Sequence, residues 1–174
     1  MIIRHFLFFI IYINFLFSCD RGEEKTVHSS RGIFQLTLPS DLTLITEDSS
    51  FKTPDGKTKI YLYHFSKKDS SGTQLSAEDA TNQILDSLIF ENNFKYVSKP
   101  VNRYSGHMPF YLIIAAQSQE LLKKERIEIV TFDSPLWIHI ILIHLKGPEF
   151  SYNRPTLDEI YESATERVKN QITP

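Results

Sequence analysis

The stretch WIHIILIHL at residues 137–145 decides the fold. Its odd and even positions are both mostly apolar, so a strand formed here would bury both of its faces. His139 and His144 are five positions apart, and a strand therefore places them on opposite faces. The stretch predicts a central strand in a sheet that is covered on both sides.

Three further strands are expected before this one, at residues 94–101, 110–118 and 126–132, and short turn signals separate them. Strands joined by such short connections pair as an antiparallel meander. Earlier in the chain, residues 33–38 alternate between apolar and polar side chains and stop at Pro39. The turn sequence Pro54-Asp55-Gly56 precedes another strand at residues 59–65 and indicates a hairpin.

Two helices are expected. Ser76 can cap the first, which ends at Asn92 or Asn93, and Thr156 with Glu159 forms a capping box that opens the last. Together these elements predict an α+β domain with an antiparallel sheet of about six to seven strands. Helices on both faces would make it an α/β/α sandwich.

This order of elements, over about residues 32–170, resembles the PsbP-like superfamily. Local matches are the opening strand that ends at Pro39, the helix from Ser76, the turn at residues 106–109 and the closing helix. Leu42 stands where many members carry Trp. The superfamily is named for an extrinsic subunit of photosystem II, and it includes bacterial lipoproteins and a Ran-binding nuclear import factor. The resemblance implies an α/β/α sandwich and a binding or assembly role, and the family's metal and Ran-contact residues find no motif match here.

Composition narrows the possible functions. The chain has 174 residues and a net charge of -2, which gives no basic field for nucleic acid. A single cysteine forms no internal disulfide and no cysteine-rich metal cluster. We expect one domain, no nucleic-acid partner and no cofactor.

The amino terminus has the pattern of a secretory signal. Arg4 precedes an apolar run at residues 6–17, which is too short to span a bilayer, since spanning needs about 20 residues. The run ends in Leu16-Phe17-Ser18-Cys19, which resembles the lipobox of bacterial lipoproteins. That resemblance implies cleavage after Ser18 and acylation of Cys19, although Phe17 departs from the usual small residue. It also implies a lipid anchor in the bacterial cell envelope, with the inner or outer membrane left open.

The expected domain organisation follows from these boundaries. Residues 1–18 are the signal peptide, residues 19–31 the lipidated cysteine with a flexible tether, and residues 32–174 the folded domain. The tether is polar and shows neither strand nor helix period, and fully extended it would reach about 40 Å.

Candidate contact residues come from two loops and one strand. Phe150, Tyr152 and Arg154 lie in a stretch punctuated by Gly and Pro, where exposed aromatic residues would suit a protein interface. Leu121 and Leu122 lie near a predicted turn and could form an apolar patch. Tyr61 and Tyr63 share one strand face and are read either as packing beneath a helix or as a ligand platform. For Phe150 and Tyr152 the alternative is that both rings pack onto the domain, and for Leu121 and Leu122 it is that the pair belongs to a neighbouring strand.

Catalytic patterns are sparse. The dipeptide Ser105-Gly106 followed by His107 suggests a nucleophile beside a base, but a hairpin turn explains it more simply. His64 could meet His139 or His144 from a neighbouring strand, yet a structural hydrogen bond is the commoner role than a metal site.

We therefore expect a non-enzymatic, lipid-anchored envelope protein that acts as a binding or assembly accessory, with the membrane and an envelope protein as its partners. The alternatives are a small-ligand carrier that uses the sheet face around Tyr61 and Tyr63, or a hydrolase with an unrecognised site.

Overall fold

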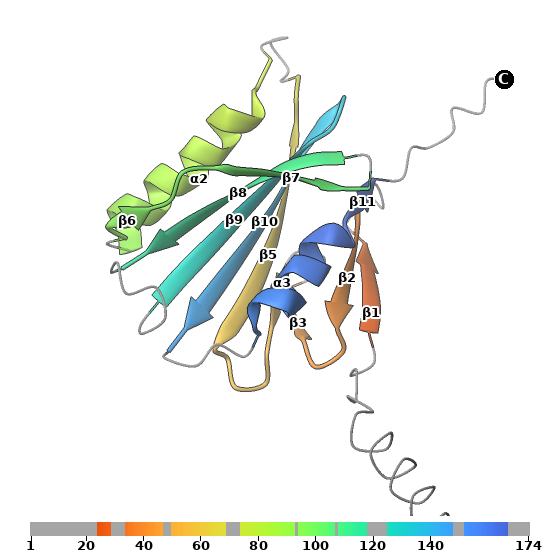
Figure 1. Cartoon of the computed structure of the whole chain (residues 1–174), viewed down its shortest axis with the longest axis vertical. Coiled ribbons are helices and arrows are strands. Elements are labelled where there is room, and N and C mark those ends of the chain that lie inside the picture. The colour runs from red at the N-terminus through yellow and green to blue at the C-terminus, as the bar shows by residue number, and fades with distance from the viewer. Residues whose placement is uncertain are drawn as a thin grey trace, which may run out of the picture.

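The computed structural model describes residues 24–28, 34–46, 50–68, 74–92, 94–106, 108–117, 125–147 and 152–166. These residues form a large sheet, a small sheet and two helices (Figure 1). The large sheet has eight strands in the order β3-β4-β5-β10-β9-β8-β6, with β7 also paired to β8. Its strands are β3 (Thr43–Thr46), β4 (Ser50–Lys52), β5 (Thr58–Ser66), β6 (Tyr96–Val97), β7 (Val101–Ser105), β8 (Met108–Ala116), β9 (Glu125–Asp133) and β10 (Trp137–Lys146).

The small sheet has three strands in the order β1-β2-β11. They are β1 (Glu24–His28), β2 (Phe34–Pro39) and β11 (Thr165–Glu166). The helices are α2 (Ala77–Asn92) and α3 (Arg154–Glu162). The pairings within both sheets are antiparallel.

The prediction for β10 is confirmed, because both of its faces are buried. Ile138, Ile140 and Leu142 pack in the cluster that contains α2. Ile141 and Ile143 pack on the other face, with β2 and α3. The meander from β8 through β9 to β10 and the alternating burial of β2 are confirmed as well.

The hairpin between β4 and β5 is also confirmed. Gly56 has a φ of 67°, and its amide donates a 2.9 Å hydrogen bond to the carbonyl oxygen of Thr53. Glycine adopts this left-handed conformation without the steric cost that a Cβ would add.

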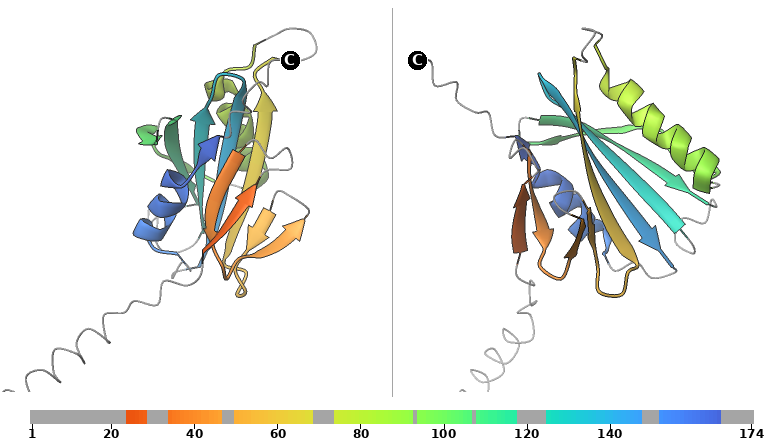
Figure 2. Two further views of the ribbon diagram at one scale, coloured as in Figure 1. Left: turned by 90° about the vertical axis from the view of Figure 1, so that its right-hand side faces the viewer. Right: turned by 180° about the vertical axis from the view of Figure 1, so that it is seen from behind.

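The expected α/β/α sandwich is wrong. The described residues form eleven strands and only two helices, so the fold is mostly β. One face of the large sheet is covered by α2, which lies over β9 and β10. The other face is covered by the small sheet together with the short helix α3, whose residues share one core cluster with β2 (Figure 2). A second sheet takes the place of a full helical layer because residues 24–28 and 165–166 pair with β2.

Several boundaries also differ from expectation. In place of the single strand expected at residues 94–101, β6 covers only Tyr96–Val97 and β7 begins at Val101. Residues 24–28 were expected in the tether but form β1, whose Glu24 is the register partner of Pro39. The last helix begins two residues before Thr156, since Asn153 is its N-cap and accepts a 3.0 Å hydrogen bond from the Thr156 amide. Pro155 fits this first turn because it lacks an amide hydrogen that would need a partner. Ser76 caps α2 as predicted and accepts a 3.0 Å hydrogen bond from the Asp79 amide.

Candidate functional site

Several predicted site residues lie outside the described residues. They are Ser18, Cys19, Leu121, Leu122 and Phe150. His107 also lies outside them.

Tyr152 is a structural residue of the domain. Only 8% of it is exposed, and its hydroxyl donates a 2.7 Å hydrogen bond to Oδ1 of Asp41. Burial and the Asp41 carboxylate raise the pKa of Tyr152 well above its usual value, so the hydroxyl stays protonated. Its ring is therefore not presented as an exposed contact.

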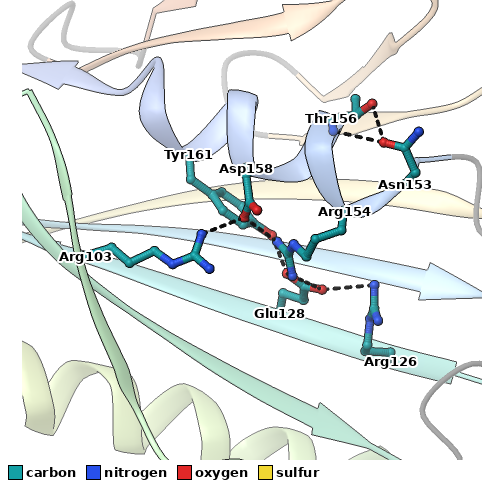
Figure 3. A network of polar contacts seen from close by, with 8 residues as sticks. All are labelled: Arg103, Arg126, Glu128, Asn153, Arg154, Thr156, Asp158 and Tyr161. Carbon is teal, nitrogen blue, oxygen red and sulfur yellow. Dashed lines mark hydrogen bonds and ion pairs between the residues drawn. The ribbon is translucent and has the colours of Figure 1, made fainter.

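Arg154 belongs to a polar network between α3 and the large sheet (Figure 3). The centre of the network is Glu128 on β9, whose side chain is fully buried. Arg154 Nη1 lies 3.1 and 2.9 Å from the two carboxylate oxygens, and the Tyr161 hydroxyl lies 2.7 Å from one of them. Arg126 Nη2 adds a 3.0 Å ion pair. Each of these donors points to the buried Glu128 carboxylate, so the network links α3 to the large sheet and has a structural role.

Asp158 extends this network toward the surface. It accepts a 2.9 Å hydrogen bond from Arg103 on β7 and pairs with Arg154 at 3.1 Å. The network thereby ties β7, β9 and α3 together. Of the three predicted contact residues in this loop, the two that the structure describes, Tyr152 and Arg154, hold the loop and helix on the domain.

Tyr61 and Tyr63 lie on the face of β5 that α2 only partly covers. Tyr61 packs against the α2 cluster, whereas Tyr63 is 39% exposed. Burial, and the nearby Tyr61, raise the pKa of Tyr63. A cleft of about 470 Å³ lies between α2 and the end of β5, but Ser66 and α2 residues line it rather than these tyrosines.

His64 and His139 meet across β5 and β10, with their Nδ1 atoms 2.9 Å apart. His139 is buried and stacks on Phe34 at 4.5 Å between ring centroids. Burial, with a smaller contribution from His64, lowers the pKa of His139 from 6.5 to about 3, so it is neutral near neutral pH. Its Nε2 is 3.7 Å from Glu166, which is too far for a hydrogen bond.

His144 lies on the opposite face from His139, as predicted. It contacts Glu125, and its ring is near Phe94 of the α2 cluster. The two strand histidines therefore do not share a site. Within the ranges that the structure describes, no group of three or more His, Cys, Asp or Glu residues is placed to hold a metal ion.

Ser105 is committed to a structural role. Its hydroxyl oxygen lies 2.7 Å from the carbonyl oxygens of both Glu162 and Ala164, which share its single hydrogen as acceptors. Gly106 follows with a φ of 56° in the turn between β7 and β8, so the hairpin interpretation is confirmed. The hydroxyl that the sequence suggested as a nucleophile thus fixes the end of α3 to this turn.

A surface cleft at this end of the domain is the best candidate for contact with another molecule. It has a volume of about 380 Å³ and is formed by the turn between β7 and β8, the turn between β9 and β10, and the start of β11. Its walls include Met108, Pro109 and Pro135. Two side chains that adjoin these turns, Tyr104 and Leu136, are each 71% exposed. We call the cleft with these two side chains the far-end patch.

Sequence reasoning missed the far-end patch. Leu136 carried a usable signal, because an apolar residue directly after Ser134-Pro135 falls in a turn and has no strand face to bury it. Tyr104 carried no such sequence signal, because its exposure depends on β7 being an edge strand that pairs only with β8.

None of the described helices is long and apolar enough to cross a membrane.

Comparison with known proteins shows a PsbP-like fold. The solution structure of cyanobacterial PsbP (CyanoP) from Synechocystis sp. PCC 6803 is similar with a TM-score of 0.59 at 6% identity, over 86% of this chain and 96% of that one. The Ran-binding protein Mog1p from Saccharomyces cerevisiae has a TM-score of 0.52 at 12% identity, over 83% and 96%. A crystal structure from Bacteroides thetaiotaomicron has a TM-score of 0.50 at 15% identity, over 86% of this chain and 50% of that one. These likenesses show the fold alone.

No protein-family model matches the chain, and no curated protein matches it in sequence.

Proposed function

We propose that this protein is an exported lipoprotein, anchored through acyl chains on Cys19, and that its domain is a non-catalytic binding or assembly accessory of the cell envelope. The observation that carries the anchor is the position of the only cysteine, directly after the apolar run and within Leu16-Phe17-Ser18-Cys19. Two or three acyl chains anchor a protein stably without a membrane-spanning helix, because each buried methylene contributes about 0.8 kcal/mol.

Two observations support a binding role. The far-end patch combines a cleft that Met108, Pro109 and Pro135 line with two exposed side chains next to the turns that form it, and exposed apolar groups of this kind are frequent in protein contacts. In addition, one protein of similar fold is described as Ran-binding, so this fold can bind a protein elsewhere.

The alternatives have less support. A carrier would need Tyr61 and Tyr63 to line a pocket, but Tyr61 packs against the α2 cluster and neither lines the neighbouring cleft. A hydrolase would need a nucleophile beside a base, and Ser105 instead donates to backbone carbonyls.

Replacing Cys19 with Ala should abolish acylation and leave an unprocessed precursor, since the thiol is the acceptor. Metabolic labelling with an alkyne fatty acid and the mass of the purified protein measure both effects. The matched control is Ser18→Ala, which keeps a small residue before the cysteine and should be labelled normally. Equal labelling of Cys19→Ala and the unchanged protein would refute the anchor.

A photo-crosslinking amino acid at position 136 should capture one envelope protein, because Leu136 projects from the far-end patch. Tyr104→Ala in the same chain should reduce that crosslink several-fold, as expected when an exposed aromatic anchor is lost. The matched control carries the crosslinker at position 44, where Leu44 is 54% exposed on edge strand β3. Identical crosslinked products from positions 136 and 44 would contradict a specific contact at the far-end patch.

A further inference from the structure

The start of β1 fixes how far the domain can lie from a lipid anchor. Glu24 begins β1 and is only five residue steps after Cys19. Fully extended chain covers at most about 3.6 Å per residue, so Glu24 lies within about 18 Å of the anchored cysteine. This is less than half of the reach expected when the whole of residues 20–31 was taken as a tether.

The same end of the domain carries the turn of the β4–β5 hairpin (Figures 1 and 2). Contacts tie the two together: Glu24 pairs with Pro39 at the end of β2, and the following turn contains Asp41, which accepts the hydrogen bond from Tyr152. The charge of Asp55 in the hairpin turn also acts on Tyr152. We call this the anchor end, and the far-end patch lies at the opposite end.

The hairpin has a charge opposite in sign to that of the chain. Residues 50–60 contain Lys52, Lys57 and Lys59 against Asp55 alone, a net charge of +2 in a chain of -2. Lys57 pairs with Asp55 at 3.7 Å, with both side chains half-exposed. Lys52 and Lys59 are direct register partners on neighbouring strands.

Like charges placed directly opposite each other destabilise a sheet unless an anion lies nearby. Among the described residues, no carboxylate forms an ion pair with Lys52 or Lys59. Both lie on the same face of the sheet as Tyr61, which is the face that carries α2. Lys52 is exposed there and Lys59 is half-buried. The lysine pair is therefore available to an anion outside the domain.

We propose that the β4–β5 hairpin contacts the membrane beside the anchor, with Lys52, Lys57 and Lys59 against anionic phospholipid headgroups. This inference rests on the proposed acylation of Cys19, which supplies the first attachment. A lysine near an anionic bilayer contributes attraction that decays within about one Debye length, roughly 8 to 10 Å, so the short connection to the anchor is what brings these side chains into range. The far-end patch then faces away from the membrane.

The test uses the full acylated protein in vesicles of equimolar phosphatidylcholine and phosphatidylglycerol that contain a nickel-chelating lipid. A nitroxide is attached at Ser40→Cys, an exposed position at the anchor end, or at Leu136→Cys at the far end. Acylated Cys19 does not react with the label. The label at position 40 should show faster relaxation by surface nickel than the label at position 136.

The triple variant Lys52→Gln, Lys57→Gln, Lys59→Gln should show a clearly smaller difference, as should vesicles of phosphatidylcholine alone, because only the short connection to the anchor then holds position 40 near the surface. The matched control removes the same charge elsewhere, from the exposed lysines Lys68, Lys95 and Lys99, and should keep the difference. Equal relaxation at both positions, or a hairpin variant that behaves like the control, would overturn the hairpin contact while leaving the anchor intact. A chain that fails to float with the vesicles before any label is read lacks the anchor, and that result overturns the proposed function as well.

Discussion

Replacing Glu128 with Ala should lower the free energy of unfolding by about 3–5 kcal/mol, the range found when one partner of a buried ion pair is removed. The carboxylate is fully buried and faces Arg126 at 3.0 Å and Arg154 at 2.9 Å. Without it, the guanidinium groups of Arg126 and Arg154 both lose the carboxylate that they share, and Arg154 keeps the ion pair with Asp158 at the rim. The Tyr161 hydroxyl also loses its acceptor. The penalty thus comes from the groups left behind, because their desolvation is no longer compensated.

Urea denaturation of the purified protein measures this loss as a lower midpoint with an unchanged slope. Asp158→Ala is the matched control, since it removes a carboxylate from the partly exposed rim of the same network and should cost about 1 kcal/mol or less. A second variant replaces Glu128, Arg126 and Arg154 together with Met, which removes the buried carboxylate and both of its arginine partners at once. It should be more stable than Glu128→Ala, because no unpaired charge remains buried. Equal stabilities for Glu128→Ala and Asp158→Ala would show that the buried Glu128 carboxylate does not dominate the network between α3 and the large sheet.

Much of the large sheet was predictable from residue pattern. In β10 both alternating sets are apolar, and a strand that is buried on both faces is the simplest arrangement for such a sequence. The glycines at positions 56 and 106 marked two hairpins because each adopts a positive φ in its turn. Local chemistry decides these features, so no knowledge of distant contacts was needed.

Other features depend on partners that are remote in sequence. Residues 24–28 contain only one apolar side chain, Val27, and become a strand because β2 offers a free edge. A polar stretch of this kind is indistinguishable from a tether until its partner is known. For this reason the sequence predicted a second helical layer where a small sheet lies. The same unseen pairing concealed how short the connection to Cys19 is.

The candidate sites show a similar division. Glu128 shares its strand face with Val130 and Phe132, so its alternation with core residues signalled a buried charge. Its partner Arg154 was predicted as a loop contact, because the network that recruits it comes from β9 and α3 together. The far-end patch joins two turns and the start of β11, which are distant in the chain, and no local motif marks such a site.

The stability of the protein should fall as the pH drops from about 6.5 toward 3, and His139 should account for a large part of the loss. Its pKa is lowered to about 3 in the folded protein, against 6.5 for an unperturbed histidine. Below pH 6.5 the imidazole of residue 139 is therefore protonated in the unfolded chain but stays neutral in the folded protein. Each pH unit in this window costs about 1.4 kcal/mol, for a total of about 4 to 5 kcal/mol when the pH reaches 3. Above pH 6.5 both states carry a neutral imidazole, and the full stability is present.

The environment of His139 explains why its imidazole stays neutral in the folded protein. Phe34 covers the ring at 4.5 Å, and His64 contacts its Nδ1 from β5. Glu166 is the nearest carboxylate, but at 3.7 Å from Nε2 it also accepts a hydrogen bond from Ser134. A charged imidazolium would therefore lose its hydration and lie against His64, and the Glu166 carboxylate, which also accepts from Ser134, does not offset that loss.

Unfolding free energies measured at pH 7 and pH 5 separate His139 from the other titrating groups. His139→Phe and His139→Gln should each lose about 2 kcal/mol less than the unchanged protein between these two values, because neither side chain titrates there. Phe retains the stacking on Phe34 and Gln retains a polar partner for His64, so the two variants differ at pH 7 but should share the reduced pH dependence. Carboxylates and His144 titrate in all three proteins and cancel in the comparison. If both variants lost as much stability as the unchanged protein, the imidazole would have to accept its proton without unfolding, and the buried histidine pair would be open to water.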